Sequence, residues 1–386
     1  MKDLSIYFES ESNGNQYLVG QLGSVVIAGD SSSYNFIEKK SIAIIYVPEY
    51  RNSSCVDVKE SWIQDFRHAF NKQFIGNWRT EIHDLGWIKP GHTIEDTYKA
   101  LKDVVSELVK SEVFPLVIGG SQDLTFAMYQ AYEKLEQTVN IMAVDPFLDL
   151  GDPDDLLKAT GWINKILLHK PNYLFNFSIF GYQSYLVNPN ELKLIDDLYF
   201  DAFRLGDYYA NEKIVEPQLR NTDLLSFDMN AIRSSDYKSN HEFLPNGFYG
   251  EDACRIMRYA GISDKLTSTG IFNFAPNPLN YQSDINLLAQ MIWYFLEGYN
   301  QRKQDYPIGL KTDYVKFRVN LDDFRDEVIF YKSDKSGRWW MEVPYPKIKG
   351  MKLQRHLLVP CSYEDYENAL KNELPNLWLK TYKKLS

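Results

Sequence analysis

Polar side chains that could bind metal or move protons follow three separate apolar runs of this sequence. Each run is long enough for a buried strand, and each is closed by carboxylate or amide side chains. A single aspartate in such a place is usually a helix cap or a turn residue. Three clusters with the same pattern instead indicate one shared site, because gathered carboxylates can hold a divalent cation or act as general bases. The clusters are Gln122 with Asp123, Asp145 with Asp149, and Asp228 with Asn230.

The elements around these clusters predict one edge of a parallel sheet. The apolar run Phe114–Ile118 is followed by Gly119-Gly120, which permits a sharp turn, and then by helical sequence up to Leu135. Helical sequence follows the other predicted strands too, so we expect a three-layer α/β/α fold with a mainly parallel sheet. Ligands bind at the carboxyl ends of the strands in such sheets, where the three clusters would meet.

The three clusters resemble the motifs of the ureohydrolase family, which includes arginase, agmatinase and formiminoglutamase. That family carries GG(D/S)H(S/D), DAHxD and SxDxD in this order. The matching text here is GGSQD at 119–123, DPFLD at 145–149 and SFDMN at 226–230. Residues 170–189 look most like the formiminoglutamase branch, and the resemblance extends over residues 40–300. It implies an arginase-like fold, two bound manganese ions, an oligomer, and hydrolysis of a linear amidine or guanidino C–N bond.

Half of the metal-ligand positions that the resemblance implies hold a different side chain. Gln122 and Phe147 stand where the family has histidines, and Asn230 stands where it has an aspartate. Asn273 occupies the place of a glutamate on the substrate side. Amides are weak manganese ligands and phenylalanine is none, so we expect no bound metal unless the chain is an enzyme, in which case manganese is the cofactor. The positions that keep a carboxylate are Asp145, Asp149 and Asp228.

One histidine outside these motifs is a weak candidate for catalysis. His241 follows the SFDMN stretch in a predicted loop, near the same strand end. It would need a carboxylate partner such as Asp228 to act as a general base. A lone histidine is more often a packing or surface residue, so no catalytic residue is assigned with this pattern alone.

Composition excludes several classes of partner. The formal net charge is −10 and no long basic run occurs, which argues against nucleic acid. No apolar run is long enough to span a membrane, and the first residues lack the apolar core of a signal peptide. Three cysteines lie far apart without a CxxC pair, as is typical of a reducing compartment. We therefore expect a cytoplasmic protein.

A change of composition after Asn300 predicts a second unit. We expect an arginase-like α/β domain over 1–310, with an irregular segment at 1–40, and a C-terminal appendage over 311–386 with a β-hairpin and helices. Within the appendage, Arg338-Trp339-Trp340 combines residue types that are common in interfaces. This segment either packs the appendage onto the domain or docks a protein partner or a second copy of the chain.

Two functions are compatible with these patterns. The first is a pseudoenzyme with a degenerate dimanganese site, which acts by binding a protein partner or a small ligand. The alternative is a divergent formiminoglutamase- or agmatinase-type hydrolase that uses one metal or none. In either case Asp145, Asp149 and Asp228 should lie close together, with amide groups of Gln122, Asn230 and Asn273 offering hydrogen bonds to them.

Overall fold

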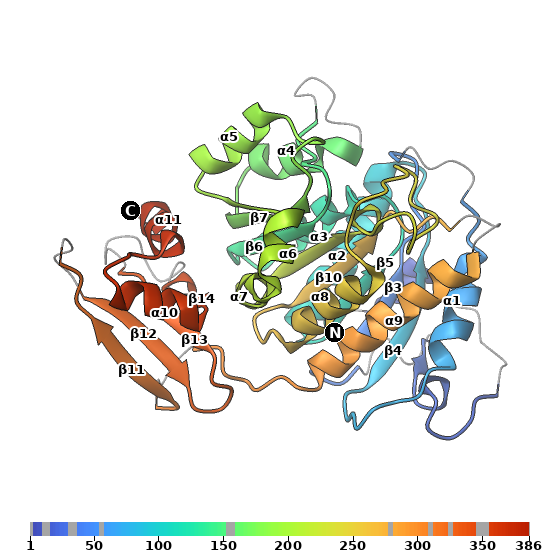
Figure 1. Ribbon diagram of the computed structural model, residues 1–386. Helices are drawn as coiled ribbons and strands as arrows, with labels where there is room; N and C mark the ends of the chain where they lie inside the picture. The colour runs from blue at the N-terminus through green and yellow to red at the C-terminus, as the bar shows by residue number, and fades with distance from the viewer. Residues whose placement is uncertain are drawn as a thin grey trace.

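A ten-stranded sheet forms the middle layer of the structure, and a smaller sheet follows near the C-terminus (Figure 1). The strands of the large sheet are β1 (Phe8–Glu9), β2 (Ile27–Ala28), β3 (Ile42–Tyr46), β4 (Ile82–Ile88), β5 (Phe114–Ile118), β6 (Val139–Val144), β7 (Leu174–Tyr182), β8 (Asp201–Arg204), β9 (Leu224–Asp228) and β10 (Ser268–Phe272). The computed structural model describes residues 3–9, 16–29, 37–53, 58–151, 159–276, 281–307, 312–322, 327–344 and 355–385.

The large sheet has the order β1-β4-β3-β5-β10-β9-β6-β7-β8, and β2 pairs with β4 beside it. All pairs from β4 to β8 are parallel, and only β1 runs antiparallel to its neighbour. The mainly parallel sheet is therefore confirmed. The N-terminal segment is less irregular than expected, because β1 and β2 extend the sheet at β4.

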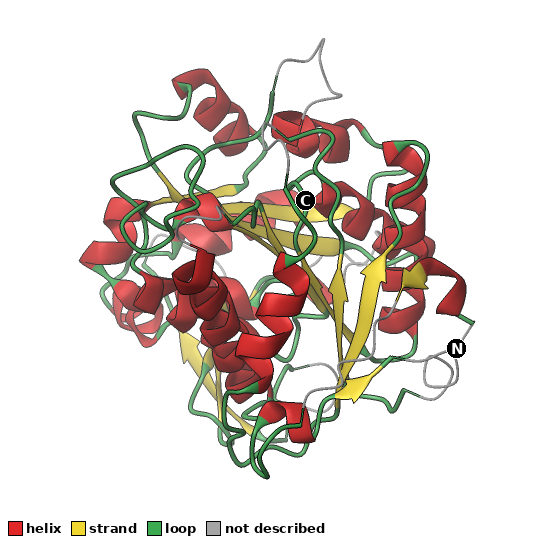
Figure 2. Ribbon diagram, turned by 90° about the vertical axis from the view of Figure 1, so that its right-hand side faces the viewer, coloured by secondary structure: helices red, strands yellow, loops and turns green. Residues whose placement is uncertain are grey.

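Helices cover both faces of the large sheet (Figure 2). Alternate residues of a strand point to opposite faces, so Ile42 and Ile44 of β3 join one core cluster while Ala43 and Ile45 join the other. The first face carries α1 (Trp62–Asn71), α7 (Val215–Arg220), α8 (Gly250–Ile262) and α9 (Tyr281–Tyr299). The second face carries α2 (Ile94–Lys110), α3 (Leu124–Lys134), α4 (Trp162–Leu168) and α5 (Pro189–Asp197). Helix α6 (Leu205–Ala210) follows β8 and contributes Tyr208 to the core cluster of the first face.

The C-terminal part of the chain forms a second, antiparallel sheet with the order β11-β12-β13-β14. We call this part, within the described residues 312–385, the C-terminal unit. Its hairpin and its two helices were expected, and its fourth strand was not. Its elements are β11 (Tyr314–Val319), β12 (Val328–Ser333), β13 (Trp339–Glu342), β14 (Leu358–Cys361), α10 (Tyr363–Leu370) and α11 (Asn376–Leu385).

The tryptophans of the C-terminal unit are buried within the chain. Trp339 is 7% exposed and Trp340 is fully buried. Arg220 of α7 donates to the carbonyls of Trp339 and Cys361 at 2.8 and 3.0 Å, and its guanidinium lies 4.5 Å from the Trp340 ring centre. Arg220 therefore holds the unit against α7, whereas the Trp339 ring stacks on Tyr366 of α10 within the unit, with 4.8 Å between ring centres. Neither tryptophan side chain is open to a docking partner.

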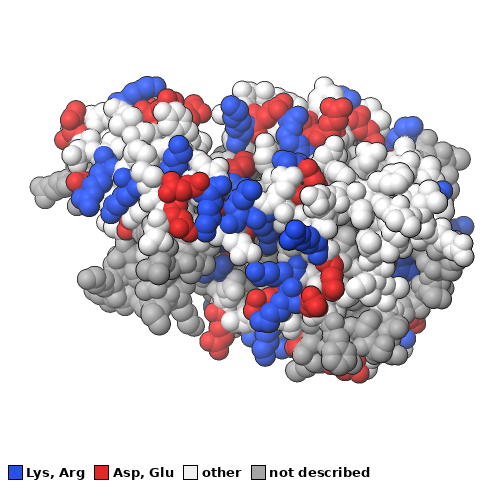
Figure 3. All heavy atoms as spheres, turned by 90° about the horizontal axis from the view of Figure 1, so that it is seen from below, with Lys and Arg blue, Asp and Glu red and all other residues white. Residues whose placement is uncertain are grey.

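Charged side chains of both signs share the surface. On the face seen from below, Lys and Arg side chains gather near the middle with Asp and Glu side chains among them (Figure 3). No helix of the described residues has the length and apolarity needed to cross a membrane. The thiols of Cys254 and Cys361 are free and buried, and Cys55 lies outside the described residues.

Candidate functional site

A glycine turn after β5 brings Gln122 to the carboxyl edge of the sheet. Gly119 and Gly120 have φ values of 93° and 75°, in the left-handed region that glycine adopts without strain. A Cβ on Gly120 would lie 2.5 Å from the Val47 carbonyl oxygen, so the chain can pass this close to the loop after β3 only without a side chain. The turn then places Gln122, which is 1% exposed, at the start of α3.

One cavity of about 340 Å³ collects most of the residues expected at the site. We call it the acidic cavity. Seven of the eight expected positions line it, and Asp145 lies buried beside it with no exposed surface. The lining residues are Asn52, Ser53, Gln122, Phe147, Asp149, Ala159, Thr160, Asp228, Asn230, His241, Glu242 and Asn273.

The carboxylate of Asp145, directly after β6, has a hydrogen-bond partner at only one of its two oxygens among the described residues. Its Oδ1 accepts a hydrogen bond from the Phe147 N–H at 2.8 Å, whereas Oδ2 has no hydrogen-bond partner among the described residues. Burial raises the pKa of this carboxyl well above its usual range, and the charges of Asp149 and Asp228 raise it further. The Phe147 N–H and the nearby side-chain amide of Gln122 lower this pKa and so oppose the effect of burial. The ionised form of Asp145 is therefore strongly disfavoured.

Asp149 and Asp228 also have raised pKa values. Burial, and then the charge of Asp228, raises the pKa of Asp149 to about 8, although its Oδ2 accepts a hydrogen bond from the Trp162 Nε1 at 3.2 Å. Burial raises the pKa of Asp228, at the end of β9, to about 7. The Asp228 Oδ1 accepts from the Asn230 N–H at 2.8 Å. Burial removes the water that would stabilise a charged carboxylate, and neighbouring carboxylates repel that charge, so both pKa values rise.

Amide side chains surround these carboxylates. Hydrogen bonds from Asn230 and Asn273 lower the pKa of Asp228 and so oppose the effect of burial. Asn273 follows β10 with a φ of 56°, and its N–H donates to the Gly120 carbonyl at 2.8 Å. The Nε2 of Gln122 donates to the Ser226 hydroxyl at 3.3 Å, and its Oε1 is buried without a hydrogen-bond partner among the described residues.

His241 lines the same cavity. Its backbone N–H donates to the Asn230 Oδ1 at 3.3 Å. Burial lowers the pKa of its imidazole, and a hydrogen bond with the Asn273 backbone partly offsets that effect. The ring is therefore neutral at pH 7. The structure thus brings His241 to the cavity, as its position after the SFDMN stretch suggested.

The loop after β3 contributes residues that the motifs did not indicate. Asn52 and Ser53 line the cavity, and Asn52 donates through Nδ2 to the Asp123 Oδ2 at 2.7 Å. Asp123 also accepts hydrogen bonds from the hydroxyls of Ser121 and Tyr98. Asp123 therefore ties the loop to the glycine turn, and it does not line the cavity. The segment at 47–51 separates this Asn-Ser pair from the end of β3, and no motif marks the pair in the sequence.

Comparison with known proteins identifies the family to which this fold belongs. The family model of the arginase family matches residues 59–296. This chain belongs to the arginase family. Among solved structures, formiminoglutamase of Trypanosoma cruzi with Mn²⁺ is 19% identical, with a TM-score of 0.62, over 68% of this chain and 94% of that one. Formimidoylglutamase of Bacillus subtilis is 14% identical, with a TM-score of 0.66, over 76% and 96%.

A third arginase-like neighbour is the agmatine ureohydrolase of Thermoplasma volcanium, at 16% identity and a TM-score of 0.57, over 74% of this chain and 96% of that one. A sequence comparison with curated proteins finds no match. These identities are low, so the neighbours show an arginase fold and no particular substrate. The matched residues 59–296 end before the C-terminal unit begins.

The residues in this arginase-family chain do not fit a pair of manganese ions. The described residues contain no group of three or more His, Cys, Asp or Glu side chains arranged to hold a metal ion. Phe147 offers no donor atom, and Gln122 and Asn230 offer neutral amides where manganese favours carboxylate and imidazole.

Proposed function

We propose that this chain is a non-catalytic member of the arginase family that binds a small organic cation in the acidic cavity. The observation that carries the proposal is the charge of the cavity wall. Asp149, Asp228 and Glu242 line it, and its lining residues, all within the described part of the chain, include no lysine or arginine. Buried carboxylates without a counter-ion are costly, and a bound cation would offset that cost.

The hydrogen-bonding groups of the cavity favour a cation that carries N–H donors. The Gln122 Oε1 is a buried acceptor that no described residue satisfies. An unmet acceptor of this kind costs on the order of 1–3 kcal/mol, and a ligand N–H would remove the cost. Amines, amidines and guanidines combine a positive charge with several N–H groups, so they are the chemical class that we expect.

Binding without turnover is supported by the chemistry of the substituted positions. Hydrolysis by a metal-activated water needs ligands that fix the metal and lower the pKa of that water. Gln122, Phe147 and Asn230 provide an amide, a phenyl ring and a second amide at three such positions. The motif resemblance assigns the family's metal-ligand positions to residues that line the acidic cavity or lie beside it, and their donor groups differ from those of the family.

A divergent amidine or guanidine hydrolase is the second candidate. One observation favours it: burial brings the pKa of Asp149 to about 8, close to the working pH of a general base. On this alternative Asp149 accepts the proton of an attacking water. Manganese would then be the cofactor expected from the family, even though the donor set fits it poorly.

Calorimetry on the purified full-length chain separates these functions. Guanidinium chloride, agmatine and putrescine are titrated with EDTA and again with Mn²⁺, and release of urea and ammonia is measured in parallel. We expect at least one cation to bind with EDTA present, and no product. The double variant Asp149→Asn/Asp228→Asn should lose at least tenfold in affinity, whereas Glu60→Gln, an exposed position outside the cavity, should bind as the natural chain does.

Other results would contradict the proposed binding function. Product that forms only with Mn²⁺ would replace the binding function with the hydrolase. Absence of binding for all three cations, or equal binding by the double variant, would remove the acidic cavity as a cation site. Circular dichroism of each variant verifies that its fold is retained before binding is compared.

A further inference from the structure

An exposed apolar surface lies where two loops meet α9. The loops lie side by side, because the Ile75 N–H donates to the Gly20 carbonyl at 2.8 Å. The second loop is tied to α9, because the Phe74 carbonyl accepts from the Trp293 Nε1 at 2.7 Å. We call this surface the apolar patch. Its side chains, three from the loop tips and three aromatic rings beside them, are Leu18, Val19, Phe74, Trp78, Trp293 and Tyr294.

The side chains of the apolar patch are in contact with water to an unusual degree. Val19 is 98% exposed, Leu18 is 68% exposed and Phe74 is 62% exposed. Trp78 and Trp293, with ring centres 5.3 Å apart, are half-buried beside them. Exposed apolar side chains that adjoin one another in this way mark an interaction surface, since docking removes them from water.

The outward side of α9 continues this surface without a charged side chain. α9 packs beside α1 in the helical layer of the first face (Figure 1). The exposed positions Asn286, Gln290 and Tyr294 are four residues apart and so share one side of the helix. The 19 residues of α9 include two charged ones. Asp284 is buried, and Glu297 forms an ion pair with α8.

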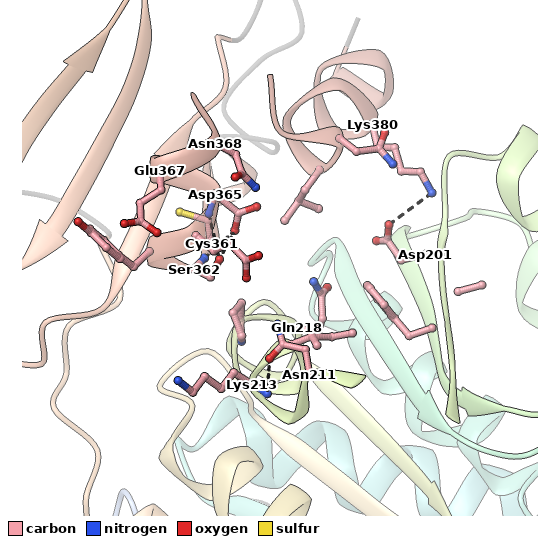
Figure 4. Close-up of a pocket in the computed structure, with 18 of the residues that line it drawn as sticks. Asp201, Asn211, Lys213, Gln218, Cys361, Ser362, Asp365, Glu367, Asn368 and Lys380 are labelled. Atoms are coloured by element: carbon pink, nitrogen blue, oxygen red, sulfur yellow. Dashed lines mark hydrogen bonds and ion pairs between the residues drawn. The ribbon is translucent and has the colours of Figure 1, made fainter. Parts of the chain in front are cut away.

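Other surfaces of the chain carry charges. On α8, which packs against α9, Glu251 is exposed and Arg255 and Arg258 are half-buried. A cavity of about 790 Å³ between the large sheet and the C-terminal unit is lined by charged side chains of both signs, among them Lys213, Asp365, Glu367 and Lys380 (Figure 4). The lack of charge is therefore a local property of the apolar patch and of α9.

Charged side chains stand at the borders of the apolar patch. Lys72 and Arg79, both exposed, lie at the two ends of the loop that carries Phe74. Asp65 of α1 lies beside the first residue of α9, where it accepts a hydrogen bond from the Tyr281 hydroxyl at 2.6 Å. An apolar, aromatic centre with few charges and a charged rim is the composition of an interface between proteins.

We propose that the apolar patch and the outward side of α9 bind the same surface of a second copy of this chain across a two-fold axis. Each side chain near such an axis lies close to its own counterpart, so a charged side chain there would face a like charge. A partner of different sequence would place no such restriction on the surface. The formal net charge of −10 makes two copies repel one another, and a surface without charges is where they can approach.

A lipid surface is the less suitable occupant of the apolar patch. The exposed amides of Asn286 and Gln290 offer hydrogen bonds that a second protein surface can return and that lipid tails cannot. The negative net charge also opposes contact with anionic lipids. The patch includes no residue of the acidic cavity, so the proposed contact does not depend on a cation there.

Sedimentation velocity of the full-length chain over a range of concentrations measures the association. We expect self-association with a dissociation constant below about 10 µM. Phe74→Lys places a charge in the contact and should raise that constant by at least about 100-fold. Leu168→Lys is the matched control, because Leu168 is 63% exposed at the end of α4 on the other face of the sheet, and it should leave the constant unchanged.

A charge swap at Tyr294 tests the two-fold arrangement. Tyr294 joins the loops of the patch to the amides of α9 and so lies near the centre of the proposed contact. Tyr294→Lys alone and Tyr294→Glu alone place like charges opposite each other, and each should weaken association by at least about tenfold. An equal mixture of the two variants places lysine opposite glutamate and should restore association to within about threefold of the natural chain.

Circular dichroism of each variant verifies its fold, which should be retained because every changed side chain is exposed. The proposal is overturned if the natural chain stays single up to about 100 µM, if Phe74→Lys associates as Leu168→Lys does, or if the mixture of Tyr294 variants stays dissociated. Flotation with vesicles of phosphatidylcholine and phosphatidylserine tests the other occupant. Co-flotation of the natural chain that Phe74→Lys abolishes would assign the patch to a lipid surface instead.

Discussion

Arg355 of the C-terminal unit and Asp223, directly before β9, form an ion pair with an Nη2–Oδ1 distance of 2.5 Å. The Asp223 side chain has no exposed surface, and that of Arg355 is 20% exposed. The same guanidinium donates through Nη1 to the Thr138 carbonyl at 2.6 Å, directly before β6. One arginine thus fixes the C-terminal unit to the amino ends of two central strands, at the sheet edge opposite the acidic cavity.

The first prediction concerns this ion pair. Arg355→Met keeps the length of the side chain but leaves the Asp223 charge buried beside Lys265 alone, 3.7 Å away. We expect a loss of about 2–3 kcal/mol in the free energy of unfolding, measured by urea denaturation. Arg318→Met removes an exposed ion pair with Glu327 and should cost less than about 1 kcal/mol. Equal losses in the two variants would show that the buried pair does not anchor the unit.

The glycine turn after β5 leads to a second prediction. Gly120→Ala introduces a Cβ 2.5 Å from the Val47 carbonyl oxygen at a φ of 75°. We expect a cost of at least about 2 kcal/mol and a displaced Gln122. Gly206→Ala is the control, since nothing lies within 4 Å of its added Cβ, and it should be neutral or stabilising by up to about 1 kcal/mol. Thermal unfolding of both variants checks the prediction, which fails if Gly120→Ala melts with or above the natural chain.

The raised pKa values of the acidic cavity predict the direction of pH dependence. In the folded chain Asp149 and Asp228 keep their protons up to about pH 8 and 7, whereas in the unfolded chain they lose them near 3.8. The folded state therefore binds more protons in between, and stability falls as pH rises from about 4 to about 8. Each carboxyl contributes up to about 1.4 kcal/mol per pH unit over its own part of that window.

A substitution isolates this contribution from other titrating groups. Asp149→Asn should flatten the dependence of unfolding free energy on pH between 5 and 8, and should be most stabilising at the alkaline end. Asp197→Asn, at an exposed position of α5, should preserve the slope of the natural chain. Urea denaturation at several pH values supplies the slopes. A slope for Asp149→Asn that matches the natural chain would contradict the proton uptake.

The last prediction restores the donor set of the family. The triple variant Gln122→His/Phe147→His/Asn230→Asp should gain manganese binding, because the spacing of the motifs is retained. Recovery of turnover is not expected, since Asn273 still replaces a carboxylate. Calorimetry with Mn²⁺ on the folded variant gives the result, with Gln122→His alone as the control that should stay weak. A folded triple variant without manganese affinity would mean that the cavity has been remodelled.

The parts of the molecule that sequence could predict are those with local signals. The strand ends at Asp145 and Asp228 follow apolar runs, and a parallel sheet brings such ends to one edge, so their approach to a common cavity was expected. Asn52 reaches the same cavity from a loop and Thr160 from the short 3₁₀ helix Ala159–Gly161. Tertiary contacts set the course of both segments, and no periodicity marks them. β1 and β2 have two residues each, too few for an alternating pattern, and β14 is recognised only by its pairing with β13.

The way the C-terminal unit is attached has a consequence for its mobility. Arg220 binds the ends of β13 and β14, Arg355 binds beside β9, and α11 returns to β7 and β8 through Lys384 and Lys380. Rotation about any one of these points is blocked by the others. The unit therefore cannot swing aside as a hinged flap, and the space between it and the large sheet keeps one shape.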